Sequence, residues 1–130
     1  MRGEIATKDL PGIWNEKFKD LFGTEPPSHN LGVMQDVHWS VGLIGYFPTY
    51  SLGNLYSAQI RESMERELGG LDALIEGGRL AEVKGYLREK VHRTGKLHPP
   101  KKLIENVTGN ALSPEPFLRY ISDKYDPLFG

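Results

Sequence analysis

The sequence predicts an all-α fold of about six helices. Apolar residues recur at helical spacing along most of the 130 residues, and glycines and prolines stand where these runs begin or end. No two alternating, strand-like runs face each other across a hairpin turn. One segment, residues 31–50, has neither a helical nor a strand period. The length predicts a single domain over residues 1–130.

The first helix is predicted over about residues 10–22. Its apolar residues follow the i, i+4, i+7, i+8 pattern of one helix face: Trp14, Phe18, Leu21 and Phe22. Asp9 stands at the position of an N-cap, and Gly23 is a plausible C′ residue.

The second helix is predicted from about residue 50 to residue 68. An apolar residue recurs at every fourth position: Leu52, Tyr56, Ile60, Met64 and Leu68. On its other side we expect two ion pairs at i,i+4 spacing, Arg61 with Glu65 and Glu62 with Arg66.

Four shorter helices complete the prediction. They cover about residues 71–75, 80–93, 99–107 and 113–125, and most are followed by glycine. His92 and Arg93 are expected in the last turn of the second of these, where cations suit the helix dipole. Pro127 is expected to break the last one.

The irregular segment, residues 31–50, combines glycines with many apolar and aromatic side chains. It contains Gly32, Gly42, Gly45 and Pro48, yet it is too apolar for a solvated loop. Such a stretch is typical of irregular backbone that packs against something else.

Composition excludes several classes of function. With 16 Lys+Arg against 17 Asp+Glu, the formal charge is −1, which argues against a nucleic-acid binder. The absence of cysteine removes disulfides, thiolate metal sites and a cysteine nucleophile. No apolar run approaches the ~20 residues of a membrane helix, and residues 1–10 do not read as a signal peptide. We therefore expect a cytoplasmic chain without a membrane partner.

The residues alone indicate no complete catalytic site. No HExxH, G-x-S-x-G or P-loop is present. Asp36 and His38 could share a face as two ligands of a new metal site, but a hydrogen-bonded histidine is the commoner arrangement. Arg93 could hold a carboxylate or simply be a solvated helix end. Tyr46 and Tyr50 are consistent with aromatic residues of the core whose hydroxyls lie at its polar boundary.

The irregular segment contains a longer pattern. Residues 32–39, Gly-Val-Met-Gln-Asp-Val-His-Trp, match GxxQDxHW, and residues 45–50 and 52–56 follow in the expected order. This arrangement resembles the M32 family of metallocarboxypeptidases. The resemblance implies part of a larger all-helical fold with a deep cleft. It also implies a zinc- or cobalt-dependent enzyme, usually a homodimer, that removes single residues from peptide C-termini.

The resemblance also defines what this chain lacks. It corresponds to about the last quarter of such an enzyme, whereas the HExxH motif with its general base belongs upstream. No residue here corresponds to a metal ligand, and no cofactor is expected in this chain. The residues that the resemblance assigns to the substrate cleft are Gln35, Asp36, His38, Trp39, Tyr46 and Tyr50, with Arg93 as a weaker candidate. We expect Asp36 and His38 to hydrogen-bond each other or neighbouring groups. All seven residues could instead support the cleft floor without touching substrate.

Two functions follow as hypotheses. The first is the C-terminal part of a carboxypeptidase that is inactive alone and has an upstream HExxH-containing portion as its partner, with a peptide as substrate. The second is a stand-alone helical interaction module, with an apolar patch of Trp14, Trp39, Tyr46 and Phe47, that could also form homo-oligomers. A short gene product, an expressed fragment and a proteolytic remnant are all compatible with this length.

Overall fold

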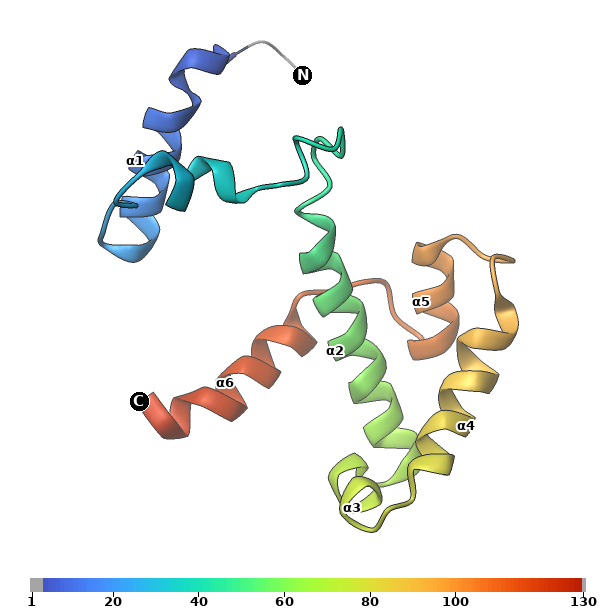
Figure 1. The fold of residues 1–130 in the computed structure, drawn as a ribbon. Coiled ribbons are helices and arrows are strands. Elements are labelled where there is room, and N and C mark those ends of the chain that lie inside the picture. The colour runs from blue at the N-terminus through green and yellow to red at the C-terminus, as the bar shows by residue number, and fades with distance from the viewer. Residues whose placement is uncertain (1–3, 130) are drawn as a thin grey trace. The chain divides into compact units, whose positions relative to one another are not determined.

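The computed structural model describes residues 4–129, and within them it contains six α-helices and no strand (Figure 1). The predicted all-α class is confirmed. None of these helices combines the length and the apolar character that crossing a membrane requires.

The chain divides into two compact units after Pro48. The first unit comprises residues up to Pro48, and the second begins at Thr49. Whether residues 1–130 behave as one domain stays a prediction. Each unit is described by itself below.

The first unit contains one α-helix and three short 3₁₀ turns. Helix α1 spans Leu10–Phe22, and the turns are Thr7–Asp9, His29–Leu31 and Val33–Gln35. Gly23 ends α1 as predicted, with a left-handed φ of 73° and an N–H that donates to the Lys19 carbonyl at 2.8 Å. Asp9 makes no side-chain capping hydrogen bond, because it belongs to a 3₁₀ turn that leads directly into α1.

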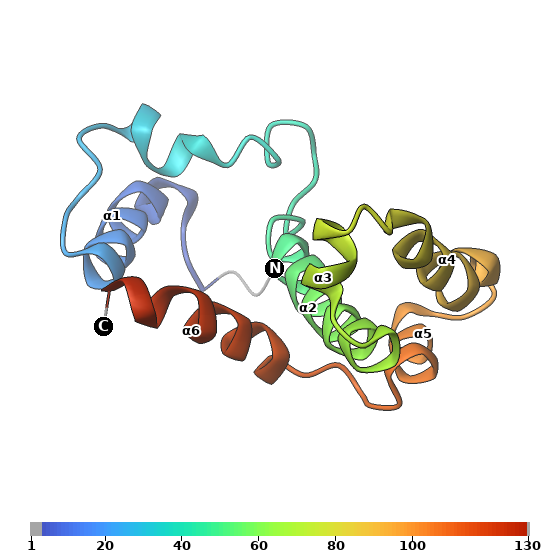
Figure 2. The same ribbon diagram turned by 90° about the horizontal axis from the view of Figure 1, so that it is seen from below.

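The second unit is arranged around the longest helix, α2, which spans Thr49–Leu68. The other helices are α3, Leu71–Glu76; α4, Leu80–Lys90; α5, Pro100–Thr108; and α6, Glu115–Phe129. Helix α2 lies between α6 on one side and α4 and α5 on the other (Figures 1 and 2).

The apolar core that the structure describes lies in the second unit. Met64 of α2, Leu71 of α3 and Tyr86 of α4 pack together, with Ile60, Leu68, Val83 and Leu87 around them. Ile104 of α5 is almost completely buried. These contacts use the stripe that the sequence predicts for α2, since burying one apolar face is the main source of helix stability in a protein.

Two predicted helix ends are wrong. Helix α4 ends at Lys90, and His92 and Arg93 belong to a separate 3₁₀ turn, because the Thr94 hydroxyl donates to the Val91 carbonyl at 2.7 Å and tightens the chain there. Helix α6 continues past Pro127 to Phe129. A proline in the last turn removes only one N–H donor, so two further residues keep helical geometry.

The two ion pairs predicted along α2 are also wrong. Arg61 pairs with Asp72 at 3.6 Å, and Glu62 pairs with Arg119 of α6 at 2.8 Å. Glu65 accepts a hydrogen bond from the Leu71 N–H at 3.2 Å. Because partners on other elements lie within reach, tertiary contacts replace the weak pairs within one helix.

Candidate functional site

The GxxQDxHW residues lie in the first unit, and the motif glycine is fixed by close packing. A Cβ at position 32 would lie 3.0 Å from the Pro26 Cβ and 3.3 Å from the Ser28 carbonyl oxygen. Both Pro26 and Gly32 are buried. Only glycine fits at this position without displacing the loop between α1 and the motif.

Gln35 links the 3₁₀ turn of the motif, Val33–Gln35, to the turn before it, His29–Leu31. Its side-chain amide donates to the Asn30 carbonyl, and its backbone N–H donates to the Gly32 carbonyl at 2.9 Å. The side chain of this predicted site residue therefore has a local structural contact.

Asp36 and His38 are hydrogen-bonded to each other, as expected. One carboxylate oxygen, Asp36 Oδ1, lies 2.8 Å from His38 Nδ1 and accepts from the His38 backbone N–H at 3.1 Å. The exposed fractions of the two side chains are 16% for His38 and 11% for Asp36. Two contacts to one oxygen fix both the backbone and the ring of His38, and a carboxylate beside Nδ1 favours the proton on that nitrogen.

Two aromatic rings pack against the His38 ring. The centroid of Tyr46 lies 5.4 Å from it, and that of Phe47 lies 5.5 Å away in an edge-on orientation. Aromatic pairs at these distances are favourable and restrict ring rotation. His38 is thus held by Asp36 at one nitrogen and by two rings.

A tight return of the backbone brings Tyr46 to His38. The Leu43 N–H donates to the His38 carbonyl at 2.8 Å, and the Gly42 N–H donates to the Trp39 carbonyl at 3.1 Å. Gly42 and Gly45 both have a φ of 77°, which residues with a Cβ rarely adopt. Gly42 and Gly45 therefore form the turns that assemble the His38 environment.

The remaining predicted site residues lie elsewhere. Trp39 follows His38 and is exposed, and Tyr50 is in the first turn of α2, in the second unit. Arg93, also in the second unit, pairs with Glu89 of α4 at 2.7 Å and is exposed. The structure thus brings Asp36, His38 and Tyr46 together, whereas Arg93 lies exposed in the 3₁₀ turn that follows α4.

Two polar residues inside α2 had not been singled out as functional or structural. Gln59 is buried; its amide nitrogen donates to Thr108 Oγ1 and to the Ala111 carbonyl, both at 3.0 Å, and its oxygen accepts from the Ser113 N–H. Ser63 is also buried and accepts from the Tyr86 hydroxyl at 3.1 Å. The available signal was that each stands one position before a member of the apolar stripe of α2, Ile60 and Met64 respectively.

Glu67 joins this polar cluster at the surface end. Lys90 Nζ lies 3.0 Å from Glu67 Oε2, and the Tyr86 hydroxyl lies 3.4 Å from Oε1. The hydrogen bond from Lys90 is the main cause that holds the pKa of Glu67 below its ordinary value, against an opposing contribution from burial.

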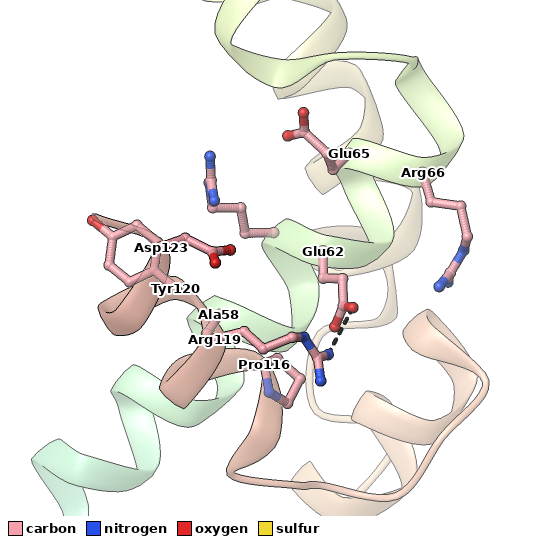
Figure 3. A pocket seen from close by; sticks show the side chains of 9 residues that line it. Ala58, Glu62, Glu65, Arg66, Pro116, Arg119, Tyr120 and Asp123 are labelled. Atoms are coloured by element: carbon pink, nitrogen blue, oxygen red, sulfur yellow. Dashed lines mark hydrogen bonds and ion pairs between the residues drawn. The ribbon is translucent and has the colours of Figure 1, made fainter. Parts of the chain in front are cut away.

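A groove of about 380 Å³ lies between α2 and α6 (Figure 3). Its charged residues are three arginines and three acids: Arg61, Arg66, Arg119, Glu62, Glu65 and Asp123. Figure 3 shows Glu62 and Arg119 joined across it, at the 2.8 Å given above. Because its lining has three charged residues of each sign, this groove does not indicate a ligand of either sign.

Among residues 4–129, no group of three or more His, Cys, Asp or Glu residues could hold a metal ion. A catalytic zinc needs three protein ligands. Asp36 and His38 provide two, and the Asp36 oxygen is already bound to His38. The described residues therefore do not fit a metal centre.

The comparison with protein families gives one match over nearly the whole chain. Residues 1–125 match the family Carboxypeptidase Taq (M32) metallopeptidase. The chain belongs to the M32 metallopeptidase family. The resemblance that GxxQDxHW indicates is thereby confirmed.

Curated relatives of this M32 chain are much longer than it is. It is 46% identical over 129 residues to Thermostable carboxypeptidase 1 of Thermus thermophilus, and 41% identical over 126 residues to Carboxypeptidase 1 of Bacillus subtilis. These alignments cover 99% and 97% of this chain but 25% of each relative. The M32 chain thus spans about a quarter of their length.

The fold is also that of M32 structures. The M32 carboxypeptidase of Deinococcus radiodurans superposes with a TM-score of 0.93 at 39% identity, covering 98% of this chain and 26% of that one. The chain therefore has the helical fold of one part of a larger M32 enzyme.

Proposed function

We propose that this chain is the C-terminal part of a metal-dependent carboxypeptidase that removes single residues from peptide C-termini. It would act only together with a portion that carries HExxH. The observation that carries the proposal is the fixed Asp36–His38 pair inside a GxxQDxHW segment, in a chain that matches M32 over residues 1–125. The extent of the match also supports the proposal, because the chain corresponds to only 25% of the Thermus thermophilus relative.

In this proposal the motif residues border the substrate cleft. In the neutral form of His38, an Nδ1–H directed at Asp36 would fix the orientation of the ring and make Nε2 the acceptor nitrogen. Such a nitrogen can accept a hydrogen bond from substrate or from a neighbouring donor. Tyr46 and Tyr50 would offer hydroxyls, and Trp39 an apolar surface. Gln35 would support the turn, and Arg93 would meet a carboxylate only after leaving Glu89.

The zinc or cobalt ion of the complete enzyme is assigned to the other portion, because the described residues here do not fit it. Such an ion lowers the pKa of a bound water so that a nucleophile forms near neutral pH. A peptide is the proposed substrate, the proposed location is cytoplasmic, and homo-oligomers are proposed as for other members of the family.

A chimera tests this function directly. This chain would replace the matched quarter of the Thermus thermophilus enzyme, and release of C-terminal residues from a blocked dipeptide would be measured for the chimera and for the chain alone. We expect activity in the chimera and none in the chain. Metal-dependent activity of the purified chain would overturn the proposed dependence on another portion. An inactive but folded chimera would overturn the assignment to the enzyme.

A control separates the motif from unspecific damage in this experiment. His38→Ala in the chimera should lower kcat by about 10²-fold, whereas His92→Ala, at an exposed position of the second unit, should leave it unchanged. The metal content should be equal in both variants, because neither histidine is assigned as a ligand.

A stand-alone interaction module is the second candidate, favoured by the exposure of Trp39, Tyr46 and Phe47. It predicts that the chain forms a defined complex in which the enzyme is not involved. Loss of the chimera's activity while such a complex persists would favour this candidate.

A further inference from the structure

The first unit exposes an unusual amount of apolar surface in one stretch of chain, residues 31–47, which we term the docking segment. Six of its large hydrophobic side chains are more than half exposed: Leu31, Met34, Val37, Val41, Ile44 and Phe47. Isolated exposed hydrophobic residues are normal on protein surfaces, but this density within seventeen residues is characteristic of a contact site.

The docking segment also has almost no charge. It contains no Lys, Arg or Glu, and its single Asp, Asp36, is largely buried against His38. Charged residues are depleted at the centre of protein interfaces and enriched at surfaces that face water. The composition therefore favours a macromolecular contact rather than a solvated loop.

The part of the first unit that the structure describes, residues 4–48, contains no buried large hydrophobic side chain. Every large hydrophobic residue that is fully buried in the described chain lies in the second unit: Met64, Leu71, Leu74, Tyr86, Ile104 and Val107. In α1, by contrast, two buried polar atoms have no hydrogen-bond partner among the described residues, Trp14 Nε1 and Asn15 Oδ1. A unit of this size whose described residues bury no large hydrophobic side chain needs external packing to hold a fixed geometry.

We propose that the docking segment is the surface on which the remaining part of the M32 enzyme packs. This proposal rests on the function proposed above. The occupant follows from length and chemistry. The chain spans about a quarter of its relatives' length, so under the proposed function the other three quarters of the enzyme would contact it. The docking segment, exposed, apolar and almost without charge in the unit that carries the motif, is the place that we assign to that contact.

This packing would have a direct consequence for the motif. Because Phe47 contacts the His38 ring from within the docking segment, covering this segment would fix the ring further and exclude water from its surroundings. The same contact that joins the two portions would then shape the His38–Asp36 environment, coupling assembly to the geometry of the site.

Amide hydrogen exchange tests the proposal on the isolated chain and on the chimera described above. We expect residues 31–47 to exchange rapidly in the chain alone and at least about tenfold more slowly in the chimera. The core helix α2 provides the internal reference, since its protection should change less. Equal exchange of the docking segment in the two proteins would overturn the proposal, and so would a chimera that fails to fold.

Matched variants locate the contact. Met34 and Ile44 are 64% and 59% exposed, so Met34→Asp and Ile44→Asp leave the described packing of the isolated chain in place. In the chimera each should lower Tm by several degrees and restore fast exchange over residues 31–47. Leu97→Asp, at a 77% exposed position of the second unit, should do neither. Equal effects of all three variants would contradict a contact at the docking segment.

Two further outcomes separate this proposal from its premise. If the docking segment is protected in an inactive chimera, the proposed enzymatic function is overturned but the proposed contact surface stands. If the chimera is active and the segment is unprotected, the contact surface is overturned but the enzymatic function stands. Protection that rises with the concentration of the chain alone would identify a second copy as the occupant and overturn the proposal.

Discussion

Asp36 binds His38 twice through one carboxylate oxygen, at the backbone N–H and at the ring nitrogen Nδ1. The two contacts act at different levels. The first fixes the turn that follows Asp36, and the second fixes the rotation of the ring. A substitution of Asp36 should therefore alter the ring even where the backbone survives.

Asp36→Ala is expected to lose the preference of His38 for a proton on Nδ1. The ¹⁵N chemical shifts of the His38 ring, measured on the isolated chain above pH 8, should show predominantly Nδ1–H in the wild type and a larger share of Nε2–H in the variant. In the chimera the same variant should lower kcat by about 10-fold or more. Unchanged ring shifts would refute an orienting role for the carboxylate.

Gly32→Ala should destabilise the first unit by about 1–3 kcal/mol, because the added methyl would be forced against Pro26 and the Ser28 carbonyl. Both tryptophans of the chain, Trp14 and Trp39, lie in this unit, so their fluorescence during urea denaturation reports it selectively. Gly12→Ala is the matched control. Position 12 lies in α1 with nothing within 4 Å of the new Cβ, and alanine should stabilise that helix by up to about 1 kcal/mol. Equal effects of the two substitutions would show that crowding at residue 32 is unimportant.

Gln59→Ala should cost the second unit about 2–4 kcal/mol, because the side chain connects α2 to the segment between α5 and α6 through both its nitrogen and its oxygen. The substitution removes a hydrogen-bond partner from the buried Thr108 hydroxyl and from the partly buried Ser113 N–H. Ser57→Ala, at an exposed position of the same helix, should change stability by less than about 0.5 kcal/mol. Circular dichroism at 222 nm during denaturation measures both, and a neutral Gln59→Ala would mean that water replaces these bonds.

The sequence predicted local features well, because they depend on neighbours along the chain. The stripe of α2 and the left-handed Gly23 follow from spacing and position alone. The Asp36–His38 bond was also predictable, since its partners stand only two positions apart in the chain.

What the sequence did not predict depends on contacts between distant residues. The need for glycine at position 32 comes from Pro26, and the role of Gln59 comes from residues about 50 positions away. The ion pairs of Arg61 and Glu62 were predicted wrongly for the same reason. Their partners in the structure lie on other helices, α3 for Arg61 and α6 for Glu62. The position of Arg93 beside Glu89 likewise depended on where α4 ends.

Stability of the second unit should fall as the solution is acidified through the range where Glu67 titrates. Its pKa is lower in the folded chain than its ordinary value of 4.5, chiefly through the hydrogen bond from Lys90. A carboxyl whose folded pKa is depressed contributes stability that is fully present above the unfolded pKa and is lost as the pH falls through the folded pKa. Because the Glu67 side chain is 37% exposed, solvent screening keeps the contribution small.

Glu67→Gln should therefore flatten the decline of the urea midpoint below about pH 5. Glu76→Gln, at an exposed position of α3, should leave the decline as in the wild type, and identical profiles for all three proteins would contradict a role of the Glu67–Lys90 pair.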